Sequence, residues 1–403
     1  MTGRGPQPPT AAGPRAERPG LGYVRDVMAL MHPGAEVTVR RRPRRGHARA
    51  WSLVPGSADP RLLVPSRPRA AAVATVSGLG GSGARGAAGS LLGLAARAGG
   101  LALLPHLVVE GDGPALAGLV EEVLGRPVAL AMSVGRVRAL QKPVLRVLGH
   151  DGSTLAYVKV GVDDTTRGLV DHEAEVLHVL AGSGLRRLVV PEVLAHRPWH
   201  GLSVLVQAPV GGPGGVTPAM VSRAALELSD IGPRQQGVVG SDGAWRDLVD
   251  RVAALAPSTS ATALVAALDE VGSRAAGTPV EWGPWHGDFA SWNMAAAGDR
   301  LAVWDWEGFA APVPVGLDLL HHRLQDAVVV EGRHPRAAVR ELAEQAPALL
   351  GPWGPADPTL VVLLYVVLLA VGFLETGDHR TRLSRLDEWL EPALAELVAG
   401  VRR

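Results

Sequence analysis

The sequence contains no cysteine, which excludes disulfide bonds, thiolate metal sites, iron–sulfur clusters and cysteine nucleophiles. It also lacks an excess of charge. Its 40 Lys and Arg residues nearly balance 39 Asp and Glu residues, so the net charge of +1 gives no general reason to expect nucleic acid or an anionic membrane as a partner. Phe and Tyr are scarce, at three each, which argues against an aromatic nucleic-acid-binding surface. The 403 residues are enough for two or three domains of roughly 100–200 residues.

Long hydrophobic runs are missing as well. The longest apolar stretch, residues 360–374, is shorter than the roughly 20 residues that span a bilayer, and it predicts a buried core helix. Residues 1–20 are rich in Gly, Pro and Arg, without the apolar segment of a secretory signal. We therefore expect a disordered tail at residues 1–20, no membrane span and a cytoplasmic location.

Lysine is almost absent, because only Lys142 and Lys159 stand among the basic residues and the others are arginine. Because nearly every other basic residue is arginine, each of the two lysines marks a candidate position where a compact ammonium group is needed. Neither lysine has the neighbours of a phosphate-binding P-loop. Gly78–Gly83 matches G-x-G-x-x-G, but no acidic residue follows it until Glu110, so we interpret the match as a product of glycine-rich composition.

A basic stretch, Arg40–Arg49, lies between the predicted strands 36–39 and 48–54. It could contact phosphates or acidic lipid, but a solvated hairpin loop is the simpler interpretation. The sequence does not define the role of this stretch or of residues 1–126.

The hydrophobic pattern changes along the chain and predicts a two-lobed α+β protein. A small β-rich part is followed by a Gly/Pro-rich linker at 208–215 and by a larger, mainly helical part. The predicted strands are 128–134, 143–148, 154–160, 192–196 and 202–207, with one helix at 164–181. Beyond the linker we expect helices near 217–231, 243–255, 259–275, 316–330, 335–347, 358–374 and 380–399, and a short β region at 279–305.

The chemically informative motif is His286-Gly287-Asp288, followed by Asn293 and then by Asp305 after a predicted strand. One carboxylate can accept or orient a hydroxyl group. An amide oxygen and a second carboxylate can hold the Mg²⁺ that bridges nucleotide phosphates. Phosphoryl transfer from a nucleotide requires this set of groups.

This pattern resembles the superfamily of aminoglycoside phosphotransferases, choline kinases and fructosamine kinases, which are relatives of protein kinases. The resemblance covers residues 128–403 and implies a bilobal kinase-like fold: an N-lobe at 127–208 and a helical C-lobe at 209–403, preceded here by an extension at 21–126. It implies that Asp288 is the catalytic residue and that Asn293 and Asp305 bind magnesium. His286 and Asp318 would support the site structurally, although Asp318 could equally act on the dipole of its helix.

The predicted N-lobe contains a matching nucleotide site. Lys159 ends a strand and resembles the kinase lysine that contacts the α- and β-phosphates, with Glu173 on the next helix as its partner. Glu175 lies about 200° around that helix from Glu173 and cannot serve equally. Gly135 is expected in the phosphate-covering turn. Lys142 opens the strand after this turn, and it could reach the γ-phosphate or a substrate anion, or merely stand on a hairpin.

Three further positions carry ionisable side chains, and the role of one of them, Glu307, is left open. Glu307 could assist the metal, contact a cationic substrate or stabilise the fold. His321 and His322 have no metal-ligand partner at a useful spacing and are interpreted as ordinary helix residues.

The sequence thus predicts a Mg²⁺-dependent kinase that transfers the γ-phosphate of ATP or GTP to a hydroxyl of a small molecule such as a sugar, an amino alcohol or an aminoglycoside. The alternative is a catalytically silent kinase-like nucleotide-binding or scaffold module. Nucleic acid is not expected as a partner.

Overall fold

The computed structural model describes residues 20–41, 49–77, 93–134, 142–377 and 381–402. The chain forms two compact units. The N-terminal unit comprises residues 1–167 and 197–206, and the C-terminal unit comprises residues 168–196 and 207–403. Helices and strands together build the chain, which confirms the predicted α+β class.

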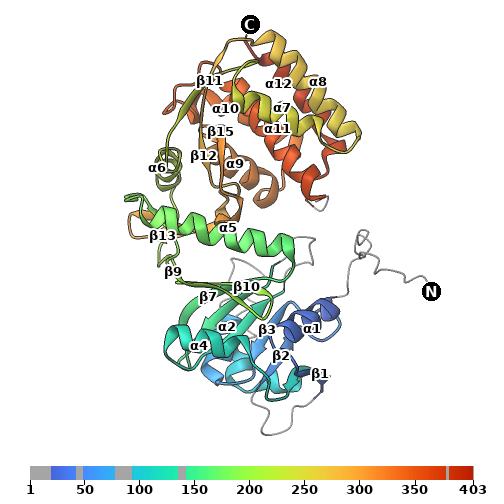
Figure 1. Cartoon of the computed structure of the whole chain (residues 1–403), viewed down its shortest axis with the longest axis vertical. Helices are drawn as coiled ribbons and strands as arrows, with labels where there is room; N and C mark the ends of the chain where they lie inside the picture. Colours follow the sequence, from blue (N-terminus) through green and yellow to red (C-terminus); the bar gives the residue numbers. More distant parts are fainter. Residues whose placement is uncertain (1–19, 42–48, 78–92, 135–141, 378–380, 403) are drawn as a thin grey trace, which may run out of the picture. The chain divides into compact units, whose positions relative to one another are not determined.

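One nine-stranded sheet, in the order β1-β4-β2-β3-β5-β6-β7-β10-β9, forms the frame of the N-terminal unit. The strand β3 lies antiparallel to β5, with Leu62 opposite Ser133, so the predicted boundary between residues 126 and 127 falls inside a single sheet. The five strands expected from the sequence are therefore one part of a larger sheet, whose strands can be followed in Figure 1. The strands are β1 (Glu36–Arg40), β2 (Ala50–Val54), β3 (Leu62–Pro65), β4 (His106–Glu110), β5 (Ala129–Ser133), β6 (Val144–Leu148), β7 (Thr154–Gly161), β9 (Val193–Trp199) and β10 (Leu202–Gln207).

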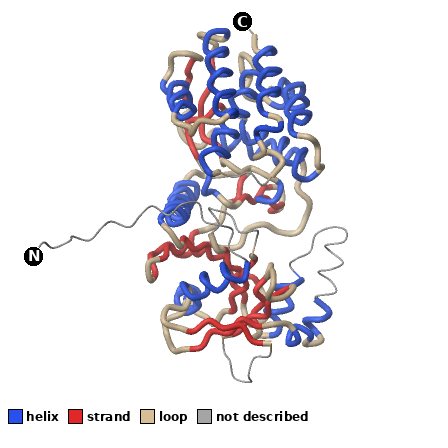
Figure 2. Tube along the Cα trace, turned by 90° about the vertical axis from the view of Figure 1, so that its right-hand side faces the viewer, coloured by secondary structure: helices blue, strands red, loops and turns tan. Residues whose placement is uncertain are grey.

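Short helices accompany this sheet, namely α1 (Gly20–Leu30), α2 (Arg69–Ser77) and α4 (Leu116–Leu124) (Figure 2). The helix α2 buries its small side chains against the sheet, where Ala72 and Val76 join a core cluster with Val54 and Val64. All residues of β2 and β3 are buried, as the apolar composition of both strands requires.

Arg40 and Arg49, at the two described ends of the basic stretch, form contacts with other residues of the N-terminal unit. Arg40 forms an ion pair with Glu110 on the neighbouring strand β4. Arg49 donates to the carbonyl oxygens of Gly111 and Gly113 at 3.4 and 3.3 Å. Residues 42–48, the glycine motif at 78–83 and Gly135 lie outside the described residues.

The C-terminal unit is built around α11 (Pro358–Thr376), which packs against α7, α9, α10 and α12 (Figure 1). Asp357 begins this helix by accepting hydrogen bonds from the N–H groups of Thr359 and Leu360. By length and composition α11 is the one described helix that could cross a membrane, but most of its apolar side chains are buried in the core of the unit. The helices of the unit are α5 (Asp164–Ala181), α6 (Pro218–Ser229), α7 (Gly243–Ala253), α8 (Thr259–Arg274), α9 (Leu317–Gln325), α10 (Pro335–Leu349), α11 and α12 (Leu390–Gly400), with α5 starting at the boundary between the units.

The predicted helix limits differ from the observed ones by more than two residues at two places. The expected helix 316–330 is α9 followed by a π-helical turn at Asp326–Val330. The expected helix 380–399 begins only at Leu390. The segment before it holds a 3₁₀ turn at Leu386–Glu388, and the indole N–H of the fully buried Trp389 donates to the Leu383 carbonyl, so this segment does not continue the α-helix.

Two small sheets place the segments that carry the predicted motif. One contains β11 (Gln235–Val238), β12 (Pro279–Trp285) and β15 (Ala310–Pro314). The other contains β8 (Leu188–Val189), β13 (Met294–Ala297) and β14 (Arg300–Val303). The chain therefore alternates between the two sheets, and both connecting loops carry motif residues.

Candidate functional site

The site is made of two loops that each follow a strand. The first loop leaves β12 and carries His286 and Asp288, and a short 3₁₀ turn then leads to Asn293. The second loop leaves β14 and carries Asp305. The β13–β14 hairpin joins the two loops, with Met294 opposite Val303, and the Trp304 N–H donates to the Asn293 carbonyl at 3.1 Å. Asn293 and Asp305 therefore lie at the same end of the β13–β14 hairpin.

Backbone contacts hold the two loops tightly together. Gly287 has a φ of 89°, and a Cβ placed on it would lie only 2.2 Å from the Gly308 carbonyl oxygen, so no larger residue fits there. Asp305 also adopts a left-handed conformation, with a φ of 73°, which is unusual for a residue with a side chain. Such strain persists only where the surrounding structure enforces it.

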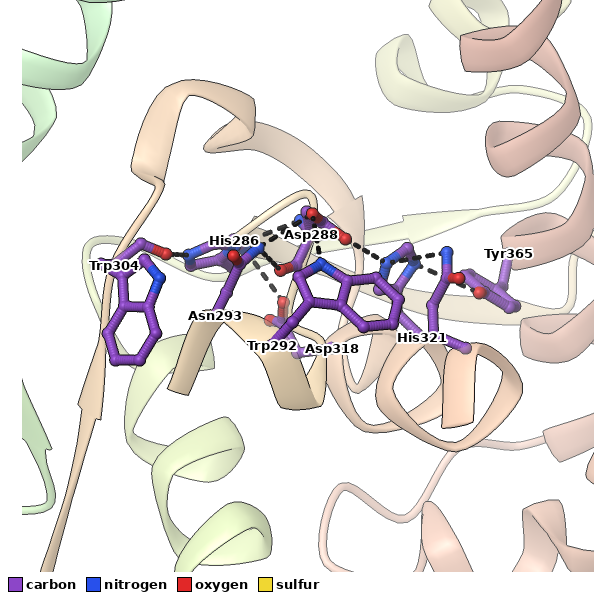
Figure 3. Close-up of polar contacts among 9 residues, drawn as sticks. His286, Asp288, Trp292, Asn293, Trp304, Asp318, His321 and Tyr365 are labelled. Carbon is purple, nitrogen blue, oxygen red and sulfur yellow. Dashed lines mark hydrogen bonds and ion pairs between the residues drawn. The ribbon is translucent and has the colours of Figure 1, made fainter. Parts of the chain in front are cut away.

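The buried imidazole of His286 ties the first loop to the second (Figure 3). Its Nδ1 lies 3.1 Å from the Asp288 N–H, and its Nε2 lies 3.1 Å from the Trp304 carbonyl oxygen. Because Nδ1 must accept and Nε2 must donate, these contacts fit the neutral ring with its proton on Nε2. Burial is the main cause that lowers the pKa of His286, to about 4, against the opposing effect of the Asp288 and Asp305 charges.

Asp318 supports the same loop from the first turn of α9. Its Oδ1 accepts a hydrogen bond from the His286 backbone N–H at 2.9 Å, and its side chain is buried. Burial raises the pKa of Asp318 to about 7, although the bond from His286 acts in the opposite direction. Its position agrees with both roles considered from the sequence, support of the loop and interaction with the helix dipole. The carboxyl group contacts the loop and also lies in the first turn of α9.

The Asp288 carboxylate is held through both oxygens. Asn293 Nδ2 donates to Oδ2 at 2.8 Å, and the Trp292 indole lies 3.4 Å from the same oxygen. His321 Nε2 lies 3.1 Å from Oδ1. Partial burial acts to raise the pKa of Asp288, but the hydrogen bonds from His321 and Trp292 act in the opposite direction, and the pKa lies below its usual range. Asp288 is therefore an ionised hydrogen-bond acceptor at neutral pH.

Two carboxylates of the second loop and one from α5 form a group. Oxygens of Glu173, Asp305 and Glu307 all lie within 4.8 Å of one another. Asn293 uses its Nδ2 on the Asp288 carboxylate and carbonyl, so its amide oxygen faces away from Asp288. Clustered carboxylates with an amide oxygen at the same end of the hairpin are hard oxygen donors of the kind that Mg²⁺ prefers. The residues present therefore fit the predicted magnesium ion.

Glu173, the expected partner of Lys159, is fully buried, whereas Glu175 on the same helix is exposed. The Oε1 of Glu173 accepts a hydrogen bond from the Trp306 N–H at 3.3 Å, next to Asp305. Glu173 belongs to the C-terminal unit and Lys159 to the N-terminal unit. Their pairing stays a prediction.

The chain's two lysines are neighbours in the N-terminal unit. Lys159 lies opposite Val144 in the β6–β7 pair, and the Val160 N–H donates to the Pro143 carbonyl. Lys142, two residues before Val144, therefore occupies a diagonal position on the face that carries Lys159. Both side chains are buried.

The prediction that His321 is an ordinary helix residue is wrong, because His321 contacts the predicted catalytic carboxylate directly. Spacing could have revealed it. Asp318 was expected to support the loop, and a residue three positions later lies on the same helix face. Its neighbour His322 contacts Asp326 instead, at 3.6 Å.

The lowered pKa of His286 makes a contribution to stability that depends on pH. The folded state binds a proton to His286 less readily than the unfolded state, whose pKa is 6.5, so this contribution is complete above pH 6.5 and decreases toward pH 4. We expect the difference in unfolding free energy between the wild type and His286→Gln to shrink by about 3 kcal/mol between pH 7 and pH 4. Asp318 is present in both proteins, so its opposite contribution cancels. Urea unfolding across this pH range measures the difference, and a constant or widening gap would contradict the neutral ring.

No protein-family model and no curated protein sequence matches this chain. Solved structures do match, with low identity. The aminoglycoside phosphotransferase APH(4)-Ia is 17% identical over 71% of this chain and 98% of its own, with a TM-score of 0.44. A choline/ethanolamine kinase family protein from Mesorhizobium loti is 18% identical over 69% of this chain and 93% of its own, with a TM-score of 0.40. A glucosamine kinase in complex with glucosamine, ADP and inorganic phosphate is 19% identical over 70% of this chain and 87% of its own, with a TM-score of 0.35.

These TM-scores are below 0.5, so the function has to be argued from the side chains of the site.

Proposed function

We propose that this protein is a phosphotransferase that moves the γ-phosphate of ATP or GTP to a hydroxyl group of a small molecule. The observation that carries the proposal is the state of Asp288. It is an ionised carboxylate, held by side chains on both oxygens and partly exposed, in a loop that His286 ties to the Asp305 loop. A carboxylate fixed in this way can accept a hydrogen bond from an acceptor alcohol and orient it for attack.

The proposed reaction assigns one role to Asp288. The alcohol oxygen attacks the γ-phosphorus, and the bond from this phosphorus to the bridging oxygen breaks, which releases the nucleoside diphosphate. The proton of the alcohol passes to the Asp288 carboxylate. Because the carboxylate is already oriented by Asn293 and His321, little reorganisation accompanies the transfer.

Asn293 and Asp305 are the residues that would hold Mg²⁺ in this scheme. Bound magnesium would neutralise charge on the phosphates. Glu173 and Glu307 add negative charge beside Asp305 and would strengthen the attraction for a cation. Glu173 is also the residue that we propose as the partner of Lys159.

Lys159 is proposed to contact the α- and β-phosphates, together with the turn at Gly135. The diagonal placement of Lys142 and Lys159 supports this assignment, since two buried ammonium groups on one sheet face attract an anion. We therefore favour a phosphate-binding role for Lys142 over a purely structural one. A sugar, an amino alcohol or an aminoglycoside remains the proposed class of acceptor.

Replacing Asp288 with asparagine tests the proposal. Asp288→Asn keeps the shape of the side chain but removes the proton acceptor. We expect turnover to fall by about 10²–10⁴-fold while nucleotide affinity stays nearly unchanged. Steady-state kinetics of phosphate transfer and calorimetric titration with nucleotide measure the two quantities.

Asp299→Asn is the matched control, because Asp299 is an exposed aspartate in the β13–β14 turn. This control should keep wild-type turnover. If Asp288→Asn also retains turnover within a few-fold of the wild type, Asp288 is not the catalytic residue.

The metal assignment predicts a graded series. Asp305→Ala removes a charged ligand and should raise the Mg²⁺ concentration needed for half-maximal activity and for nucleotide binding by at least about 10-fold. Asn293→Ala should act in the same direction but more weakly, because it removes a neutral ligand. Calorimetric titration of nucleotide at several Mg²⁺ concentrations checks both variants. An unchanged Mg²⁺ dependence in Asp305→Ala would remove Asp305 from the metal site.

A further inference from the structure

One oxygen of Asp288 is held by a residue from outside the two loops. His321 projects from α9, its side chain is only 4% exposed, and its Nε2 lies 3.1 Å from Asp288 Oδ1. Figure 3 shows the ring between Asp288 on one side and Tyr365 on the other. His321 therefore links the site to the helical core.

The hydroxyl of Tyr365 contacts the other ring nitrogen of His321, and this contact bears on which nitrogen carries the proton. Its hydroxyl lies 3.2 Å from His321 Nδ1, and its side chain is fully buried in α11. Burial, assisted by the Asp288 charge, raises the pKa of Tyr365 well above its usual value, so the hydroxyl keeps its proton. Since His321 Nδ1 is the acceptor that the described residues offer to this hydroxyl, Nδ1 accepts and the proton of a neutral ring lies on Nε2, toward Asp288.

The amide of Gln325 fits the same arrangement. Its Nε2 lies 3.3 Å from His321 Nε2, on the same helix and one turn further along. An amide occupies its pocket equally well with oxygen and nitrogen exchanged, so the Gln325 oxygen is the atom that suits an Nε2–H. The His321 ring is further confined by edge-on contacts with Trp285 and Tyr365, at ring distances of 5.9 and 6.0 Å.

We propose that His321, fixed by Tyr365 as the Nε2–H tautomer, is a positioning residue that aims the Asp288 carboxylate at the acceptor hydroxyl. This inference rests on the proposed phosphoryl transfer. A neutral donor holds Oδ1 without neutralising the carboxylate, so Asp288 keeps both its direction and its negative charge. A displacement of about 1 Å at a reacting group can reduce a rate about 10²-fold, so the direction of the carboxylate matters.

Three substitutions separate positioning from simple packing. His321→Leu removes the donor and should lower kcat by about 10–10²-fold, with the KM for nucleotide nearly unchanged. His321→Gln can place an amide N–H near the position of Nε2 and should restore most of kcat. Tyr365→Phe removes a single hydroxyl and should lower kcat by about 2–10-fold, because the proton of His321 is then no longer fixed on Nε2. His322→Gln is the control on the same helix, because His322 contacts Asp326 and not Asp288, and it should behave as the wild type.

A second measurement is independent of activity. Nitrogen-15 NMR of the imidazole of His321 in the full chain should show a protonated Nε2 and an unprotonated Nδ1 at neutral pH. The same spectrum of Tyr365→Phe should show a mixture of tautomers. This readout also covers the case in which His321→Leu does not fold.

The outcomes distinguish this inference from the proposed function. If the wild type transfers phosphate but His321→Leu keeps wild-type kcat, or His321→Gln is as impaired as His321→Leu, the positioning role is overturned and the kinase activity stands. An Nδ1–H tautomer or a doubly protonated ring in the wild type also overturns the inference. If the wild type transfers no phosphate, the proposed function fails, while the NMR result still decides whether Tyr365 directs the His321 proton toward Asp288.

Discussion

The arrangement of the site depends on one neutral imidazole. His286 accepts a hydrogen bond from the Asp288 N–H and donates one to the Trp304 carbonyl, so a single ring sets the spacing between the loop of Asp288 and the loop of Asp305. The arrangement requires an uncharged ring, which burial favours. The two loops held in this way also touch through their backbones at Gly287 and Gly308. They can lie this close only because Gly287 has no side chain.

A second imidazole contacts the same carboxylate from the other direction. His286 acts through the backbone of Asp288, and His321 acts through its side chain. Each ring has a partner on both nitrogens, and these partners, the Trp304 carbonyl and the Tyr365 hydroxyl, define where its proton lies. In the proposed arrangement one ionised aspartate lies between two imidazoles. This combination would preserve the charge that the proposed phosphoryl transfer requires and restrict the motion of the group that carries it.

The sequence predicted much of the C-terminal unit because its signals are local. Apolar spacing located most helices within a few residues, and the His286, Asp288 and Asn293 motif identified the first loop. The sequence did not predict that residues before 127 continue the sheet of the next segment, because the pairing of β3 with β5 joins residues far apart in the chain. It also assigned no role to His321. The spacing from Asp318 could have placed His321 beside Asp288, but its contact with Tyr365 depends on how α9 and α11 pack, and no spacing within one helix reveals that.

The most direct test of this account is a transfer assay with the purified full chain. ATP or GTP is supplied with Mg²⁺ and a panel of sugars, amino alcohols and aminoglycosides, and phosphorus NMR and mass spectrometry identify the products. The account predicts that one acceptor class gains a phosphate on a hydroxyl group while an equal amount of nucleoside diphosphate forms. Nucleotide binding with no phosphate transfer to any member of the panel, and no hydrolysis of the nucleotide by water, would contradict it and indicate a silent kinase-like module.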